Sequence, residues 1–148
     1  MKFIPEALYK KIIGIMPVVC VDAVININRS VLLLKRLDNP AKGLWWVSGG
    51  RVYKGETLEK AIIRNVKRET SLDVKIEKCI GTYNLIFRKG KFGKSCHNVV
   101  VCFVVKPNYK KFKIRIDKDH SAFKTIKKLE NNLHPYIKTI IKESKVLV

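Results

Sequence analysis

The 148-residue sequence has few acidic residues and no long hydrophobic segment. It contains 12 aspartates and glutamates against 31 lysines and arginines, which gives a formal net charge of +19. Its longest apolar runs, PVVCVDAVI and VVVCFVV, are far shorter than the ~20 residues that a membrane-spanning helix needs. The first residues also lack the apolar segment and cleavage site of a secretory signal. We therefore expect a soluble, cytoplasmic protein without membrane association.

Cysteine pairs at metal-finger spacing are also absent from the sequence. The four cysteines form no C-x-x-C pair, and two of them lie in apolar runs, where cysteine behaves as a small hydrophobic residue. Cys96 and His97 with Cys102 make at most half of a zinc site, because no second pair stands at the required spacing. We expect free thiols and no zinc.

No internal repeat, low-complexity segment or Pro/Gly/Ser-rich linker interrupts the chain. A chain of this length buries roughly two-thirds of its unfolded surface around one core. Residues 1–148 are therefore predicted to form a single domain.

Hydrophobic spacing predicts an α/β sandwich. Helical spacing occurs in residues 5–15, 57–70 and 134–147, and Thr57 is a candidate N-cap. Strands are expected at 17–27 and 30–36, joined at Asn28 and Arg29, with a short strand and turn at 44–50. Further strands are expected at about 74–76, 81–88, 98–106 and 123–126.

The positive charge indicates a polyanionic partner such as a nucleotide, nucleic acid or an acidic membrane face. However, the lysines are spread along the whole chain, which equally describes a solvated, lysine-rich surface. Aromatic residues do not alternate with the lysines in a base-stacking pattern. Nucleic acid therefore stays an alternative partner that the sequence does not favour.

One segment carries a chemical motif. In GGRVYKGETLEKAIIRNVKRETSL, residues 49–72, the fixed spacing of Gly50, Glu56, Arg64 and Glu69 is followed by an aliphatic Leu72. This pattern resembles the signature of the Nudix hydrolases, G-x5-E-x7-R-E-U-x-E-E-x-G-U, where U is aliphatic. The resemblance implies the Nudix fold, a mixed sheet sandwiched between helices, over essentially the whole chain.

The motif departs from the signature at three positions. Asn65 and Arg68 replace two carboxylates, and Ser71 replaces the usual glycine. A unit positive charge ~4 Å from a monovalent cation costs about 4 kcal/mol at an effective dielectric of ~20, and a divalent ion doubles this. A multi-metal cluster is therefore disfavoured. The resemblance implies one Mg²⁺, which Mn²⁺ can replace, on the carbonyl of Gly49 and the carboxylate of Glu69. Without the motif, Glu69 would be interpreted as an ordinary helix-surface acid.

A longer segment, LLLKRLDNPAKGLWWVSGGRVYKGETLEKA, is similar to the GDP-mannose mannosyl hydrolase branch of that family, which also loses acids from the motif and keeps the last glutamate. The resemblance implies hydrolysis of a nucleoside-diphosphate sugar by water attack at sugar C1, releasing the sugar and a nucleoside diphosphate. The stretch IFRKGKFGKSC is shorter than the branch's sugar- and base-facing loop, so specificity for guanine or mannose does not carry over.

The branch also implies roles for residues outside the helix. Asp22 matches its strand-end acid, while Arg36, Arg51 and Arg64 match its arginines in order. Because Asp22 interrupts an apolar strand, its carboxylate needs a partner such as Arg36. As alternatives, Arg36 is a solvated strand end and Arg51 pairs with Glu56.

The segment RIDKDHSAFKTI is similar to the branch's catalytic loop. The similarity implies that His120 is the general base and that Asp119 binds the metal where the branch has a glutamine. An imidazole titrates near pH ~6.5 in model peptides and can accept a proton at neutral pH. Taken alone, His120 would more often be a surface or capping histidine.

Three functions follow in order of preference. The first is the Mg²⁺-dependent nucleoside-diphosphate-sugar hydrolase, which the altered motif favours. The second is an ordinary Nudix pyrophosphatase that cleaves a nucleoside diphosphate derivative at phosphorus. The third is a catalytically weak Nudix domain that binds nucleotides or RNA, and the retention of Glu69, Asp119 and His120 argues against it. The sequence leaves a homodimer open.

Overall fold

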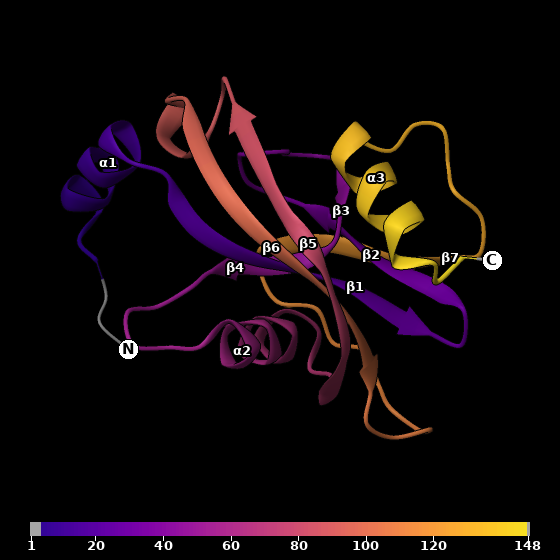
Figure 1. The fold of residues 1–148 in the computed structure, drawn as a ribbon. Coiled ribbons are helices and arrows are strands. Elements are labelled where there is room, and N and C mark those ends of the chain that lie inside the picture. Colours follow the sequence, from indigo (N-terminus) through magenta and orange to yellow (C-terminus); the bar gives the residue numbers. More distant parts are fainter. Residues whose placement is uncertain (1–3, 148) are drawn as a thin grey trace.

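The computed structural model describes residues 4–147, which form a seven-stranded mixed sheet between helices (Figure 1). In chain order the elements are α1 (Glu6–Ile15), β1 (Val18–Ile27), β2 (Ser30–Arg36), β3 (Trp45–Trp46), β4 (Ser48–Arg51), α2 (Leu58–Thr70), β5 (Val74–Phe87), the 3₁₀ turn η1 (Lys91–Gly93), β6 (Cys96–Pro107), β7 (His120–Ile126) and α3 (Pro135–Ser144). None of the helices in this part of the chain has the length and apolarity that a membrane crossing requires.

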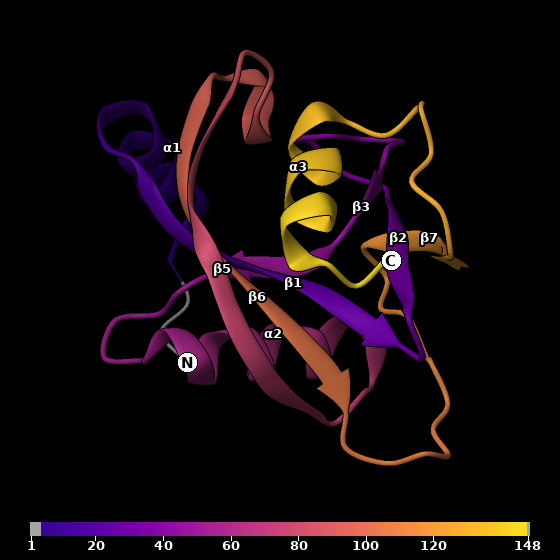
Figure 2. The same ribbon diagram turned by 45° about the vertical axis from the view of Figure 1, so that its right-hand side comes forward.

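The strands follow the order β3-β2-β1-β6-β5, while β4 pairs with β1 and β7 pairs with β2. β1 and β6 run parallel, and the remaining pairs are antiparallel. β5 and β6 form a long twisted pair whose η1 tip extends beside α1 (Figure 2). This tip and α1 therefore form one end of the molecule.

Two apolar layers cover the sheet. α2 lies on one face and α3 on the other, as Figures 1 and 2 both show. α2 buries one stripe, Ala61, Ile62 and Val66, against the strands. On the opposite face α3 packs through Tyr136, Ile137, Ile140 and Ile141. The predicted architecture, a mixed sheet between helices, is confirmed.

The boundaries of α2 follow from its capping residues. The hydroxyl of Thr57 accepts a hydrogen bond from the backbone N–H of Lys60 at 3.2 Å, which confirms the predicted N-cap. Ser71 adopts the left-handed conformation with φ of 64° at the C-terminal end. This position is the one where the signature has glycine. Ser71 therefore ends the helix in the left-handed conformation, although glycine adopts this conformation more readily.

Three expectations about strands were wrong in detail. The strands expected at 74–76 and 81–88 are one strand, β5, because two register shifts let pairing with β6 continue across the interruption. The short strand and turn expected at 44–50 are two strands, β3 and β4, which pair with different neighbours, so Gly49 and Gly50 lie in a strand rather than in a turn. The last strand begins at His120, opposite Arg36, so this histidine lies at a strand end rather than in a loop.

Candidate active site

A pocket of about 280 Å³ is lined by strand β4, the end of α2, the start of β7 and helix α1. Most of the predicted site residues line it: Asp22, Arg36, Gly49, Gly50, Arg51, Glu69, Asp119 and His120. Glu56 and Arg64 are outside its described lining. The fold thus brings residues from positions 22 to 120 into one cavity.

Gly49 and Gly50 allow β4 to lie directly against β1 and α2. A Cβ atom on Gly49 would lie 2.0 Å from Asp22 Oδ1, and one on Gly50 would lie 2.6 Å from Asn65 Oδ1. Real Cβ atoms do not approach oxygen so closely. Any side chain at either position would therefore displace β4 from β1 or α2.

Glu69 is buried, with 5% of its surface exposed. Its Oε2 accepts hydrogen bonds from Ser48 Oγ at 2.7 Å and from the Gly49 N–H at 3.1 Å. Arg68 donates to the other oxygen, Oε1, at 3.2 Å. Burial raises the pKa of Glu69, and the Ser48 hydrogen bond and nearby positive charge partly oppose the rise. The carboxylate is thus fixed in orientation, with Oε1 beside the Arg68 guanidinium.

Asn65 and Arg68 occupy the positions where the signature has acids. Asn65 is fully buried, and its side-chain nitrogen donates to the Ala61 carbonyl of the same helix at 3.0 Å. Its side-chain oxygen lies against Gly50 of β4. Arg68 donates to Asn65 Oδ1 at 3.1 Å and lines the pocket beside Glu69. The side of α2 that faces the pocket therefore presents one carboxylate and a guanidinium.

His120 pairs with an aspartate that the sequence did not identify. Its Nδ1 lies 2.7 Å from Asp117 Oδ1, and its side chain is only 2% exposed. Ligand atoms of Glu69, Asp117 and His120 all lie within 4.8 Å of one another, a group that can hold a metal ion. The carboxylate of Asp119 is not in this group, although its N–H donates to Asp117 Oδ1 at 3.2 Å. The only sequence signal for Asp117 was its spacing of three residues before the histidine.

The hydrogen-bond partner of Asp22 is Tyr136 rather than Arg36. Tyr136 donates its hydroxyl to Asp22 Oδ2 at 2.8 Å, while Arg36 Nε donates to the Pro40 carbonyl at 2.7 Å. Burial raises the pKa of Asp22 to about 7; the Tyr136 hydrogen bond lowers it, the charge of Glu69 raises it and that of Arg36 lowers it. Tyr136 lies 114 residues away in the chain, so no local pattern could have identified it.

Arg64 has a supporting position. Its Nε and Nη2 donate to the two carboxylate oxygens of Glu56 at 2.6 and 2.9 Å, and Nη2 also donates to the Arg51 carbonyl at 2.9 Å. Because Glu56 pairs with Arg64, its expected alternative pairing with Arg51 is wrong. The guanidinium of Arg51 instead lies 4.9 Å from the ring centre of Tyr9 and 5.6 Å from that of Tyr53.

Comparisons with known proteins show which family the chain resembles. The model of the NUDIX domain matches residues 16–142. The low-salt glycan biosynthesis protein Agl8 of Haloferax volcanii is 34% identical over 136 residues, which cover 90% of this chain and 86% of that protein. An ADP-ribose pyrophosphatase of Methanocaldococcus jannaschii is 43% identical over 68 residues, 46% of this chain and 40% of that protein.

Solved structures show the same fold. A NUDIX hydrolase from Nitrosomonas europaea superposes with a TM-score of 0.69 at 18% identity, covering 87% of this chain and 88% of the other. A MutT protein from Methanosarcina mazei Go1 gives 0.66 at 21% identity, covering 88% and 98%. At these identities the likeness concerns the fold alone.

Proposed function

We propose that this chain, which belongs to the NUDIX family and is a Nudix hydrolase, hydrolyses a nucleoside-diphosphate sugar by water attack at C1 of the sugar. The observation that carries the proposal is the group of Glu69, Asp117 and His120, which we call the metal-binding corner and in which Glu69 and His120 are buried and Asp117 is half-buried. It combines one retained motif carboxylate with a histidine–aspartate pair. Glu69 and His120 line a pocket that three arginines, Arg36, Arg51 and Arg68, also line.

The donor atoms of this corner fit one hard divalent cation. Mg²⁺ and Mn²⁺ prefer carboxylate and carbonyl oxygens. Glu69 and Asp117 would supply these oxygens, together with the carbonyl of Gly49 in the adjoining strand β4. Asp119 remains the alternative ligand. The Arg68 guanidinium on Glu69 Oε1 disfavours a second ion, as Coulomb repulsion predicts. A bound divalent cation would stabilise the negative charge on the departing diphosphate.

His120 is positioned to take a proton from water. With Nδ1–H donated to Asp117 Oδ1, the imidazole presents Nε2 as the acceptor. The same pairing leaves Asp117 Oδ2 for the cation. Because the departing diphosphate is already a stable anion, no acid has to protonate it. One base and the cationic groups therefore suffice for the reaction at carbon.

The arginines divide into two roles. Arg36 and Arg51 line the pocket and would bind the oxygens of the diphosphate. Arg64 instead hydrogen-bonds both Glu56 and the backbone carbonyl of Arg51, and so positions the end of β4. Asp22, which pairs with Gly49 across the β1–β4 ladder, would contact a sugar hydroxyl.

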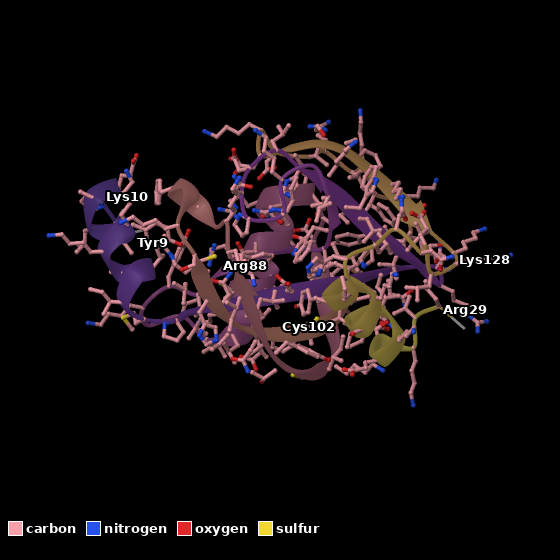
Figure 3. All side chains as sticks on the ribbon, turned by 90° about the horizontal axis from the view of Figure 1, so that it is seen from above. Tyr9, Lys10, Arg29, Arg88, Cys102 and Lys128 are labelled. Atoms are coloured by element: carbon pink, nitrogen blue, oxygen red, sulfur yellow. The ribbon has the colours of Figure 1, made fainter. Side chains whose placement is uncertain are left out.

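The relatives support a substrate that carries a sugar. The relative similar over most of the chain is named for glycan biosynthesis, and glycans are built from activated sugars. A second candidate is pyrophosphate cleavage at phosphorus, which the local similarity to an ADP-ribose pyrophosphatase favours. Nucleic-acid binding gains less support, because Lys10 and Lys128 lie at opposite ends of the molecule in Figure 3. The cytoplasmic location, the single-domain organisation and a homodimer remain predictions.

Product analysis tests the proposal. The protein would be incubated with Mg²⁺ and a panel of ADP-, GDP- and UDP-sugars, and the products separated by anion exchange. Attack at C1 yields free sugar and nucleoside diphosphate. Release of nucleoside monophosphate and sugar phosphate from every substrate turned over would establish the pyrophosphatase instead.

A further inference from the structure

The pocket extends from the metal-binding corner to α1. Its lining there consists of Tyr9 and Ile13 of α1, Lys91 of η1 and Asn98 of β6, which we call the α1 wall. The NUDIX model begins to match at residue 16, whereas α1 ends at Ile15. Part of the pocket is therefore built by a helix outside the segment that matches the family.

Strand register places the α1 wall in line with the metal-binding corner. On β1, the residue that pairs with Arg51 lies two positions before the one that pairs with Gly49. The residue that pairs with Asn98 lies two positions earlier still. Since a strand advances ~3.3 Å per residue, Arg51 is roughly 7 Å and Asn98 roughly 13 Å from Gly49 along the sheet. Asn98 of the wall therefore lies farther from Gly49 than a diphosphate alone reaches, which leaves room for a diphosphate and a ribose between them.

The aromatic ring of the wall is held in place from several sides. Tyr9 contacts Phe92 edge to face, with the ring centres 6.2 Å apart. The Arg51 guanidinium lies 4.9 Å from the Tyr9 ring centre, and the Lys91 ammonium lies 5.9 Å from it. Figure 3 shows Tyr9 on the side of α1 that faces the rest of the fold. α1 and the η1 tip therefore form a preorganised wall with aromatic and cationic groups.

We infer that the α1 wall binds the nucleoside end of a nucleotide, with the base against Tyr9 and the phosphates directed past Arg51 towards Gly49. The inference rests on the proposed function, which supplies a nucleotide substrate and places its diphosphate at the metal-binding corner. Aromatic rings and guanidinium groups bind the flat faces of bases, and the Asn98 amide can both donate to and accept from a base edge. Asp22, which is level with Gly49 on β1, and Asn39 also line the pocket, and both suit the hydroxyls of a sugar.

Binding measurements separate this role from catalysis. Isothermal titration with ADP, GDP, UDP and pyrophosphate in Mg²⁺ would compare the wild type with Tyr9→Leu and Tyr9→Phe. Tyr53→Leu is the matched control, because Tyr53 contacts the same Arg51 guanidinium but is outside the described pocket lining. Thermal melts would show that each variant is folded.

Tyr9→Leu should weaken the nucleoside diphosphates by about 5- to 100-fold and leave pyrophosphate unchanged. Tyr9→Phe should behave as the wild type. Equal weakening of pyrophosphate, or no weakening of the nucleotides, would overturn the inference. The same selective loss in Tyr53→Leu would also overturn it, since the effect would then act through Arg51. If no nucleotide sugar is hydrolysed and the selective loss remains, the proposed function fails and the α1 wall stands.

Discussion

Glu69 and Asp22 are two carboxylates in one pocket, buried almost equally at 5% and 6% exposure, but their surroundings differ. Glu69 has a hydroxyl, a backbone N–H and a guanidinium around it, and it lies beside Asp117 and His120. Asp22 has one tyrosine hydroxyl and the repulsion of Glu69 itself. The donors around Glu69 therefore hold its carboxylate in one orientation beside the other metal-binding groups, whereas Asp22 has a single hydrogen-bond donor and a pKa raised to about 7.

The largest effect should come from Glu69→Gln, which removes the only carboxylate of α2 on the pocket side. A metal ion supplies several kcal/mol of charge stabilisation, so kcat/KM should fall by about 10³-fold or more, and Mn²⁺ affinity should fall with it. Steady-state kinetics and metal titration check this. Glu59→Gln, an exposed acid on the same helix, is the control and should stay active. Full Mg²⁺-dependent turnover by Glu69→Gln would remove Glu69 from the metal site.

His120→Gln should lower kcat by about 10²- to 10⁴-fold and change KM much less, because the base acts mainly in the transition state. The control is His97→Gln, which changes a histidine that is hydrogen-bonded to Asn84 of β5 and should leave kcat unchanged. A His120 variant that kept its rate would favour the pyrophosphatase.

Asp117 and Asp119 are the two candidate metal ligands next to His120, and substituting each of them distinguishes between them. Asp117→Asn should impair both kcat and metal binding, because one oxygen holds the imidazole and the other is left for the ion. Asp119→Asn should change both quantities little if Asp117 is the ligand. The opposite result in kinetics and Mn²⁺ titration would return the metal site to Asp119, as the sequence predicted.

Asp22→Asn tests the other side of the comparison. The pKa of Asp22 rises from 3.8, the ordinary value for an aspartate, to about 7 in the folded protein. Between these two pH values the folded state therefore binds more protons than the unfolded state. The free energy of unfolding should therefore fall as pH rises through this range. Asp22→Asn keeps an acceptor for Tyr136 and removes the fall, so it should stabilise the protein at pH ~8, by up to about 4 kcal/mol, and hardly at pH ~4. Denaturant unfolding with a chelator present checks this, and a pH-independent effect would contradict it.

The smallest effect is expected at Arg68, whose side chain is 48% exposed and therefore screened by water. Arg68→Glu should allow a second Mn²⁺ to bind, with an affinity change of about tenfold for the first ion. Arg68→Gln removes the charge without adding a ligand and should still bind one ion. Unchanged stoichiometry in Arg68→Glu, measured by titration, would show that the guanidinium does not limit the site.

The sequence predicted what depends on local pattern. Helical spacing and the Thr57 cap identified α2, and residues with positive φ at Asn28 and Arg29 turn β1 into β2 as expected. The motif spacing placed Gly49 and Glu69 in the same pocket because a turn and the following helix have fixed geometry. The roles assigned to these residues remain predictions.

What the sequence missed depends on contacts between distant segments. Tyr136 reaches Asp22 only because α3 packs on the face of the sheet opposite α2. His120 lies in a strand because it pairs with Arg36 across the β2–β7 ladder, a contact that its own segment does not encode. The contribution of α1 to the pocket could not be predicted either. The apolar spacing of α1 predicts a helix, but it does not predict which part of the protein that helix packs against.

The most direct test of the account is the fate of the water oxygen. The nucleotide sugar turned over fastest would be hydrolysed in water enriched in oxygen-18, and both products analysed by mass spectrometry. Attack at C1 with His120 as base predicts the label in the released sugar and none in the nucleotide. Label in a phosphate group would contradict the account, because the water would then have attacked phosphorus.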